Sequence, residues 1–337
     1  MRAAIEKICA RFGDDYWLKR DSDGNFPEEF YRALADDGWL GVCIPQAYGG
    51  SGLGVSEAAV MMQAVAASGA GLSGASAIHM NIFGLNPVAV YGTEEQKQRM
   101  LPPIAAGKEK ACFAVTEPDA GLETGKIKTR AERRGEIYTI TGAKIWISTA
   151  QVADRMLLLA RTAPSGAGRK PTDGLSLFYT TLDRRHVEVR EIAKMGRKAV
   201  DSNQLFIDAL PVPAADRIGE EGRGFEYLLH GFNAERILVA AEAIGLGRAA
   251  LARASTYAKG PRRVRPADRT EPSHSASVSG VLDGTRSRRS DDAQGGMAVR
   301  SGHGLRARGK RREISRRRSR IQSLPNRDRD AWRLWLC

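Results

Sequence analysis

Hydrophobic positions in the first third of the chain recur at helical spacing. Phe26, Phe30 and Leu34 are four positions apart, and this spacing predicts an amphipathic helix. An Ala- and Met-rich stretch follows a loop that contains Pro and Gly, and farther on Thr93 precedes a Gln by three positions. A Thr and a Gln at that spacing are typical of a capping box at a helix N-terminus. We therefore predict an N-terminal helical domain at residues 1–110.

The period changes beyond residue 110. Short runs that favour β-structure alternate with Gly, Pro and charged turns, a pattern typical of β-strands. These runs are 137–140, 156–160, 175–180, 187–190 and 204–208. They predict a middle domain, residues 111–212, that folds as an antiparallel β-barrel or sandwich.

Helical spacing resumes near Gly222 and continues for several turns without a proline. This predicts the first long helix of a C-terminal helical domain at residues 213–259. The periodic pattern then ends, so we expect residues 260–337 to be a disordered basic tail. The predicted fold class is α+β, with an N-terminal helical domain, a middle β domain and a truncated C-terminal helical domain.

The net charge of +13 comes almost entirely from the tail. Residues 260–337 hold 20 of the 52 Lys and Arg residues but 8 of the 39 Asp and Glu residues, so the preceding chain is nearly neutral. A basic nucleic-acid-binding protein is one alternative, but the tail has no aromatic residue before Trp332, which disfavours base stacking. We therefore expect no nucleic-acid partner.

Other features of composition restrict location and chemistry. The chain has no run of eighteen apolar residues, so we expect no membrane span. Its four cysteines lack the spacing of a metal or redox motif, which predicts no metal site and a reducing, cytoplasmic location.

The segment 111–148 carries the clearest candidate chemistry. It contains CFAVTEPDAG at 112–121 and GAKIWIS at 142–148. Pro118 favours an extended conformation at the preceding residue, and a strand that ends in a Thr- and Gly-containing loop offers backbone N–H groups and a hydroxyl to a ligand. The alternative is structural: two strands of an antiparallel sheet with Trp146 in the core.

These two motifs resemble the middle domain of the acyl-CoA dehydrogenase family, in which both lie against the isoalloxazine ring of FAD. The resemblance covers about residues 1–259 and includes GWLGVCIPQAYGGSGLG and YGTEEQKQRMLPPIAAGK nearer the N-terminus. It implies FAD-dependent α,β-dehydrogenation of an acyl-CoA thioester to the trans-2-enoyl-CoA, by α-proton abstraction and β-hydride transfer to flavin N5. It also implies fatty acid and lipid metabolism, a homo-oligomer, and an electron-transfer flavoprotein as acceptor. An acyl-CoA oxidase-like flavoprotein, which would form peroxide, is the alternative within this class.

The resemblance also implies roles for individual residues. The implied flavin contacts are Phe113, Val115, Thr116, Leu122, Trp146, Ile147 and Ser148. The Thr116 hydroxyl would bond the polar edge of the ring, Trp146 would cover the ring, and Ser148 would reach the neighbourhood of N5. Many family members carry a Ser where this chain has Leu122, so a hydroxyl usually offered to the cofactor pyrophosphate or to CoA is missing.

The catalytic base has two positions in the family. Many members place a Glu late in the C-terminal domain, whereas a subset uses a Glu immediately before an Arg on the long helix. Here that pair is Glu235 and Arg236. We predict Glu235 as the base, and Asn233 and Arg236 as substrate-binding residues. The alternative is an exposed helical Glu beside a structural Arg.

The abrupt change of composition after residue 259 has a third explanation. Read from the second nucleotide of codon 261 with freely chosen synonymous codons, the tail can encode an Arg-x-x-Phe-Gly segment and further sequence that resembles the family's C-terminal domain. We therefore hypothesise a single-nucleotide frameshift near codons 260–261, in the gene or in its sequencing, which resequencing codons 255–265 would test. With the C-terminal domain truncated, we expect poor FAD binding and impaired or absent activity.

Overall fold

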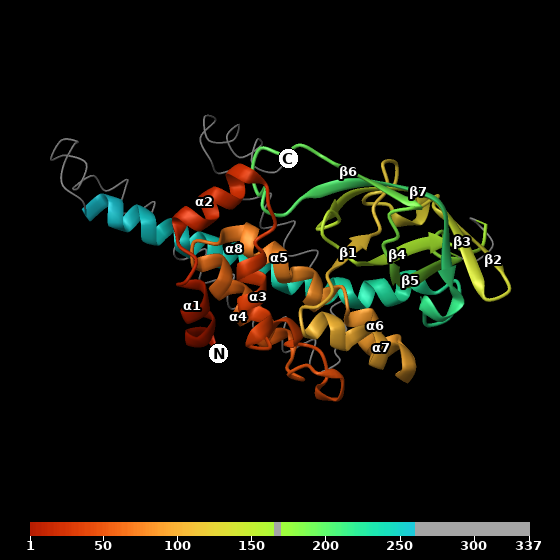
Figure 1. Ribbon diagram of the computed structural model, residues 1–337, viewed down its shortest axis with the longest axis horizontal. Helices are drawn as coiled ribbons and strands as arrows, with labels where there is room; N and C mark the ends of the chain where they lie inside the picture. Colours follow the sequence, from red (N-terminus) through yellow and green to blue (C-terminus); the bar gives the residue numbers. More distant parts are fainter. Residues whose placement is uncertain (165–169, 260–337) are drawn as a thin grey trace. The chain divides into compact units, whose positions relative to one another are not determined.

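A computed structural model describes residues 1–164 and 170–259 of the chain. N-terminal helices, an eight-stranded sheet and a long helix follow one another (Figure 1). The predicted α+β organisation is therefore confirmed. The disordered tail and the frameshift, both assigned to residues 260–337, lie outside the described residues.

The N-terminal helices form where the hydrophobic spacing predicts them. Phe30 and Leu34 are fully buried on one face of a helix, because residues four apart lie one above the other. The capping box is also confirmed, since the Thr93 hydroxyl accepts from the backbone N–H of Gln96 at 3.2 Å and the Gln96 side chain accepts in return at 2.9 Å. The helices are α1 (Arg2–Cys9), α2 (Asp14–Asp23), α3 (Glu28–Asp36), α4 (Val55–Ala67), α5 (Gly71–Phe83), α6 (Asn86–Tyr91) and α7 (Glu94–Ala105).

The sheet contains every predicted β-run but is mixed rather than antiparallel. Its strands are β1 (Ala111–Ala114), β2 (Arg130–Arg134), β3 (Ile137–Ser148), β4 (Arg155–Arg161), β5 (Leu175–Thr181), β6 (Val187–Glu191), β7 (Ser202–Pro213) and β8 (Arg217–Ile218). The strand order is β6-β7-β3-β2-β4-β5-β8, and β1 pairs with β4.

The parallel pairs correct the expected arrangement of the two motif strands. Strand β1 runs parallel to β4, whereas β3 runs antiparallel to β2 and β7, so the motif strands are not ladder partners. The physical reason lies in burial: β1 is almost entirely buried, and a strand covered on both faces suits parallel pairing.

Helix α8 (Gly224–Lys259) links the sheet to the N-terminal helices. It packs along α4 and α5 and against β5, as its course in Figure 1 shows, and Leu228 and Leu238 on it are buried. A Cβ at Gly245 would lie 2.4 Å from the Gln63 carbonyl oxygen. The close approach of α4 and α8 therefore requires a glycine at that position.

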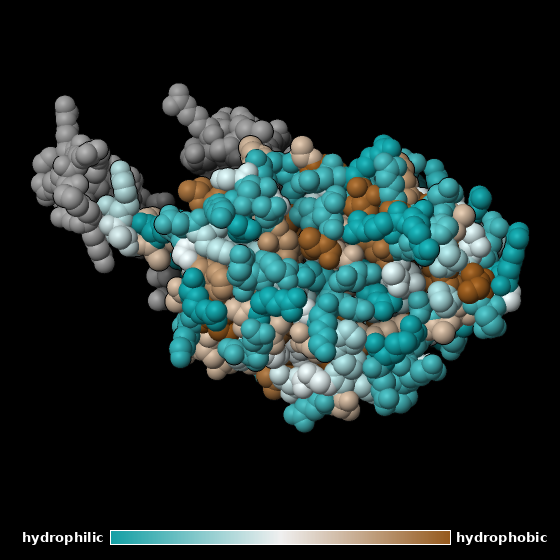
Figure 2. Space-filling model, in the orientation of Figure 1, coloured by the Kyte–Doolittle hydropathy of each residue, from teal (hydrophilic) through white to brown (hydrophobic). Residues whose placement is uncertain are grey.

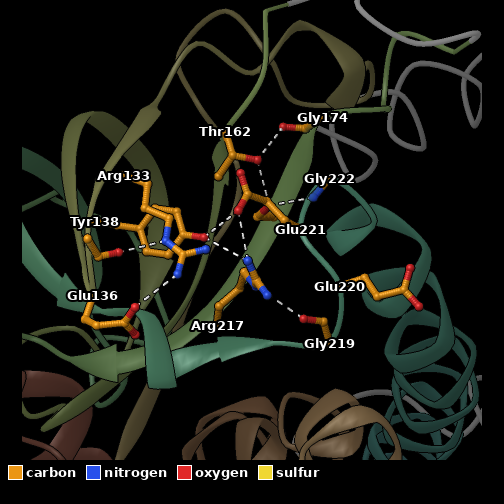
Figure 3. A network of polar contacts seen from close by, with 12 residues as sticks. Arg133, Glu136, Tyr138, Thr162, Gly174, Arg217, Gly219, Glu220, Glu221 and Gly222 are labelled. Atoms are coloured by element: carbon orange, nitrogen blue, oxygen red, sulfur yellow. Dashed lines mark hydrogen bonds and ion pairs between the residues drawn. The ribbon is translucent and has the colours of Figure 1, made fainter.

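A polar network fixes the start of α8 on the sheet (Figure 3). The Tyr138 hydroxyl donates to the Glu221 carboxylate at 2.6 Å, and the Arg217 guanidinium donates to both groups, at 2.8 and 2.9 Å. The Gly222 N–H donates to the Ser176 hydroxyl at 2.8 Å. Residues from β3, β5 and β8 thus hold the loop that leads into the helix carrying the predicted base.

Several large hydrophobic side chains of the described residues are exposed. On the face in Figure 2, hydrophobic residues are scattered among hydrophilic ones. Across the described residues, no helix is both long and apolar enough to cross a lipid bilayer. Leu122 and Trp146, two of the predicted flavin contacts, are among the exposed hydrophobic residues.

Candidate functional site

A β-bulge near the end of β3 turns Trp146 out of the sheet. In the pairing of β3 with β7, Lys144 lies opposite Leu205 and Ile147 lies opposite Asn203, so two residues of β3 face one of β7. Trp146 has φ +61° and its side chain is 61% exposed. Bulges re-aim side chains in this way beside functional sites. The alternative of a core Trp is therefore wrong, and the ring is available to a ligand.

The loop after β1 lies directly beside this bulge. The N–H of Ile145 donates to the Thr116 carbonyl at 2.9 Å, which joins the two motifs side by side. Thr116 is half-buried. Val115 is buried in the core between the helices and the sheet. Leu122 is fully exposed.

A buried ion pair that sequence analysis left unassigned holds this arrangement. The Lys144 ammonium donates to the Glu117 carboxylate at 3.0 Å and to the carbonyls of Val115 and Leu159 at 3.1 and 2.7 Å. Glu117 also accepts from the backbone N–H groups of residues 128 and 129, at 2.7 and 2.9 Å. Burial lowers the pKa of Lys144 to about 8, although the Glu117 carboxylate opposes the shift. The pair joins the Thr116 loop to three other chain segments, at residues 128–129, 144 and 159.

Ile147, the residue after Trp146, is held in place by a hydrogen bond from strand β7. Ile147 is buried in the sheet core. The Asn203 amide, fully buried on β7, donates to the Ile147 carbonyl at 2.8 Å. The Gln151 amide in turn donates to Asn203 at 2.9 Å. This chain of hydrogen bonds fixes the bulge and the Ser148 that follows it.

Ser148 connects the sheet with helix α5 through Arg197. The Arg197 guanidinium donates to the Ser148 hydroxyl at 3.3 Å and to the Ser76 hydroxyl on α5 at 2.8 Å. The pKa of Arg197 is lowered by burial, and the charges of Glu242 and Asp201 oppose that shift. Arg197 was not among the predicted site residues.

Three aromatic rings lead from β1 to α8. The ring of Phe113 lies 5.2 Å from that of Phe83 on α5 and 5.7 Å from that of Phe232 on α8. Such centroid distances are typical of favourable aromatic pairs. A predicted flavin contact on β1 therefore lies against the helix that carries the predicted base.

The predicted base is half-buried on α8. Burial raises the pKa of the Glu235 carboxyl, and the charges of His79 and Arg236 partly oppose the rise. Glu242, two turns farther along the helix, adds to it. Glu242 is itself buried, and its carboxylate makes a close hydrogen-bond contact with a ring nitrogen of His79 on α5. The alternative of an exposed helical Glu at position 235 does not fit this intermediate burial.

The two predicted substrate-binding residues lie together on α8. The Arg236 guanidinium donates to the Asn233 side-chain oxygen at 3.2 Å, and Arg236 is exposed. Its positive charge is therefore open to an anionic ligand at the surface.

The structure thus gathers most of the predicted residues and adds several that were missed. Leu122 stands apart as a fully exposed side chain. Glu117 and Lys144 lie within the two motifs, so a charged residue in or directly after a mainly apolar strand was a usable signal. His79 and Arg197 are isolated in the sequence, and no local pattern marks them. The missed residues are Glu117, Lys144, Asn203, Arg197, His79 and Glu242.

The chain is similar to known proteins over most of its length. The acyl-CoA dehydrogenase N-terminal domain model matches residues 1–108, and the middle domain model matches residues 112–210. An acyl-CoA dehydrogenase of Mycobacterium tuberculosis is 34% identical over 266 residues, or 77% of this chain and 66% of that protein. The caffeyl-CoA reductase-Etf complex subunit CarC of Acetobacterium woodii is 32% identical, over 71% of this chain and 62% of that protein.

A solved structure shows the same fold. Butyryl-CoA dehydrogenase from Megasphaera elsdenii superposes with a TM-score of 0.81 at 25% identity, over 90% of this chain and 80% of that chain. The matched part of the chain spans slightly less than two thirds of the length of the curated relatives named above. Two consecutive domain models, matched in order, together cover more than half of the chain. The chain therefore belongs to the acyl-CoA dehydrogenase family.

Proposed function

We propose that this chain is an FAD-dependent acyl-CoA dehydrogenase that converts an acyl-CoA thioester to the trans-2-enoyl-CoA. The observation that carries the proposal is the half-buried carboxylate of Glu235. It lies one turn from Phe232, whose ring is 5.7 Å from that of Phe113, a predicted flavin contact. The predicted base is on α8, and the predicted flavin contact Phe113 is on the adjacent strand β1. This arrangement would hold the α-proton near the base while the β-hydrogen faces the flavin.

The residues around Trp146 fit a planar heteroaromatic cofactor. The exposed indole ring would cover one face of an isoalloxazine, and the half-buried Thr116 and Ser148 would offer hydroxyls to its polar edge. Val115 and Ile147, which are both buried, would support this cradle from the core. A bound FAD would supply the acceptor for the β-hydride.

Glu235 would act as the general base in this site. A carboxylate removes a weakly acidic α-proton better when its pKa lies nearer to the working pH, and burial raises the pKa of Glu235 in that direction. His79 and the charge of Arg236 partly oppose this rise. Turnover should therefore increase as pH rises through the raised pKa and then level off.

Family membership also supports a proposal for the substrate and for the electron acceptor. The exposed Arg236, bonded to Asn233, would bind the CoA part of the substrate by its charge. One relative's name contains a complex with Etf, which supports an electron-transfer flavoprotein as the electron acceptor. The proposal includes a cytoplasmic homo-oligomer that acts in fatty acid metabolism, with impaired turnover should the frameshift hypothesis hold.

The full chain with excess FAD provides the test. Acyl-CoA thioesters of several chain lengths are added without oxygen, and loss of the flavin absorbance is followed. Glu235→Gln should keep FAD affinity while the bleaching disappears, because the amide cannot accept the proton. Glu226→Gln is the matched control, since Glu226 is an exposed Glu on the same helix, paired with Arg223. Undiminished bleaching in Glu235→Gln would show that Glu235 is not the base. If the wild-type chain binds FAD but no acyl-CoA bleaches that flavin, the proposed activity is contradicted.

A further inference from the structure

Arg197 adopts a backbone conformation that is unusual for its residue type. It lies in the loop between β6 and β7 with φ +55°. This left-handed region crowds the Cβ of every residue except glycine. A non-glycine residue stays there only when its surroundings hold it, and such residues concentrate at functional sites.

Two hydroxyls from separate elements hold the Arg197 side chain. Its guanidinium donates to Ser76 on α5 at 2.8 Å and to Ser148 at the end of β3 at 3.3 Å. The side chain is partly buried, and the carboxylates of Glu242 and Asp201 act on it. Because arginine keeps its proton even when burial lowers its pKa, the group is a fixed cation between the sheet and the helices.

The chemistry of this contact determines the direction of the Ser148 proton. A serine hydroxyl has one O–H donor and two acceptor lone pairs, whereas a guanidinium has donors only. Ser148 must therefore accept from Arg197, and its own proton is left for a different acceptor. A hydroxyl that also accepts from a cation is a stronger donor, because charge polarises a chain of hydrogen bonds.

We infer that Arg197 is a positioning residue that directs the Ser148 O–H toward the flavin and so favours the reduced cofactor. The inference rests on the proposed function, because it needs FAD beside Ser148. Hydride transfer would leave a hydrogen on N5 and place additional negative charge on the ring carbonyls, so the acceptor of the Ser148 proton would be a carbonyl of the polar edge. A donor already oriented by a cation would stabilise that charge without rearrangement. Arg197 acts through Ser148 and is not itself assigned a contact with the cofactor.

Paired flavin titrations test the inference on the full chain. The dissociation constants for oxidised and for reduced FAD are measured without oxygen, and their ratio gives the preference for the reduced form. Arg197→Met and Ser148→Ala should each lower that preference by about tenfold, which corresponds to about 30 mV for a two-electron couple. The double variant should lower it no further than either single variant, because both changes break the same chain of hydrogen bonds. Arg197→Lys, which keeps the charge, should recover part of the preference.

Two further variants separate positioning from general damage. Arg185→Met removes an exposed guanidinium paired with Asp183 on the same domain and should leave the ratio unchanged. Ser76→Ala removes one anchor of Arg197 but keeps its charge, and should lower the preference less than Arg197→Met does. If Arg197→Met does not fold, the ratio of the two dissociation constants is compared among Arg197→Lys, Ser76→Ala and Ser148→Ala instead.

The outcomes distinguish the inference from the proposed function. Equal ratios in wild type, Arg197→Met and Ser148→Ala, or effects that simply add in the double variant, would overturn the inference while FAD binding stands. A wild-type chain that binds neither form of FAD would refute the flavin site itself, and the inference with it.

Discussion

Replacing Lys144 with Met removes the cation from the most deeply buried ion pair of the candidate site. Glu117, 6% exposed, would keep two backbone N–H donors but lose its positive partner. The carbonyls of Val115 and Leu159 would also lose their donor. Breaking a buried ion pair by removing one partner costs about 3–5 kcal/mol. We expect the free energy of unfolding to fall by an amount in that range.

Urea unfolding, followed by circular dichroism and by tryptophan fluorescence, measures the loss. Lys128→Met is the matched control, because the Lys128 side chain is 75% exposed and pairs with an equally exposed Asp119; such a pair contributes about 0–1 kcal/mol. The double variant Lys144→Met/Glu117→Leu should lose less than the two single variants together, since replacing both members of a buried pair with apolar groups is often close to neutral. A Lys144→Met loss no larger than that of Lys128→Met would refute the reasoning.

The same pair predicts how stability depends on pH. Burial lowers the folded pKa of Lys144 to about 8 from its ordinary 10.5, so between these values the unfolded chain binds a proton that the folded chain has released. This contribution to stability is present above pH 10.5 and is lost as pH falls through about 8. For Glu117, burial acts to raise the pKa, but the Lys144 charge and the backbone N–H groups lower it overall. Its contribution is present above its ordinary value of 4.5 and is lost as pH falls through the lowered pKa. Both slopes should be absent in the double variant.

Three further changes test other parts of the structure. Gly245→Ala places a Cβ 2.4 Å from the Gln63 carbonyl oxygen and should cost about 1–3 kcal/mol; an unchanged melting temperature would contradict the close packing of α4 on α8. Leu122→Ser should change the free energy of unfolding by less than about 0.5 kcal/mol, because the side chain is fully exposed. Titration of this variant should show tighter binding of FAD or CoA. Unchanged affinity for both ligands would show that a hydroxyl at this position does not contribute to binding. Trp146→Gly relieves a positive φ and should raise the free energy of unfolding by about 1 kcal/mol while FAD affinity falls; unaltered FAD affinity would show that the indole does not cover the flavin.

Local pattern predicted much of the fold. The spacing of Phe30 and Leu34 marked a buried helical face, and the Thr93 capping box marked a helix start, because both depend on residues within one or two turns. The β-runs were also found from local pattern, since runs of β-favouring residues bounded by Gly, Pro and charged turns mark strands. The pairing of β1 with β4 was not predicted, because a strand's own sequence does not state which edge it will join.

The sequence by itself determined the elements, the nearly neutral body of the chain and, through two motifs, the family and the residues to inspect. Tertiary structure alone decided which side chains act together. It joined Arg197 to Ser148 across 49 positions and His79 to Glu242 across 163, and it turned Trp146 outward through a bulge. Such contacts depend on how helices and sheet pack, and packing brings together groups whose sequence neighbours carry no sign of it.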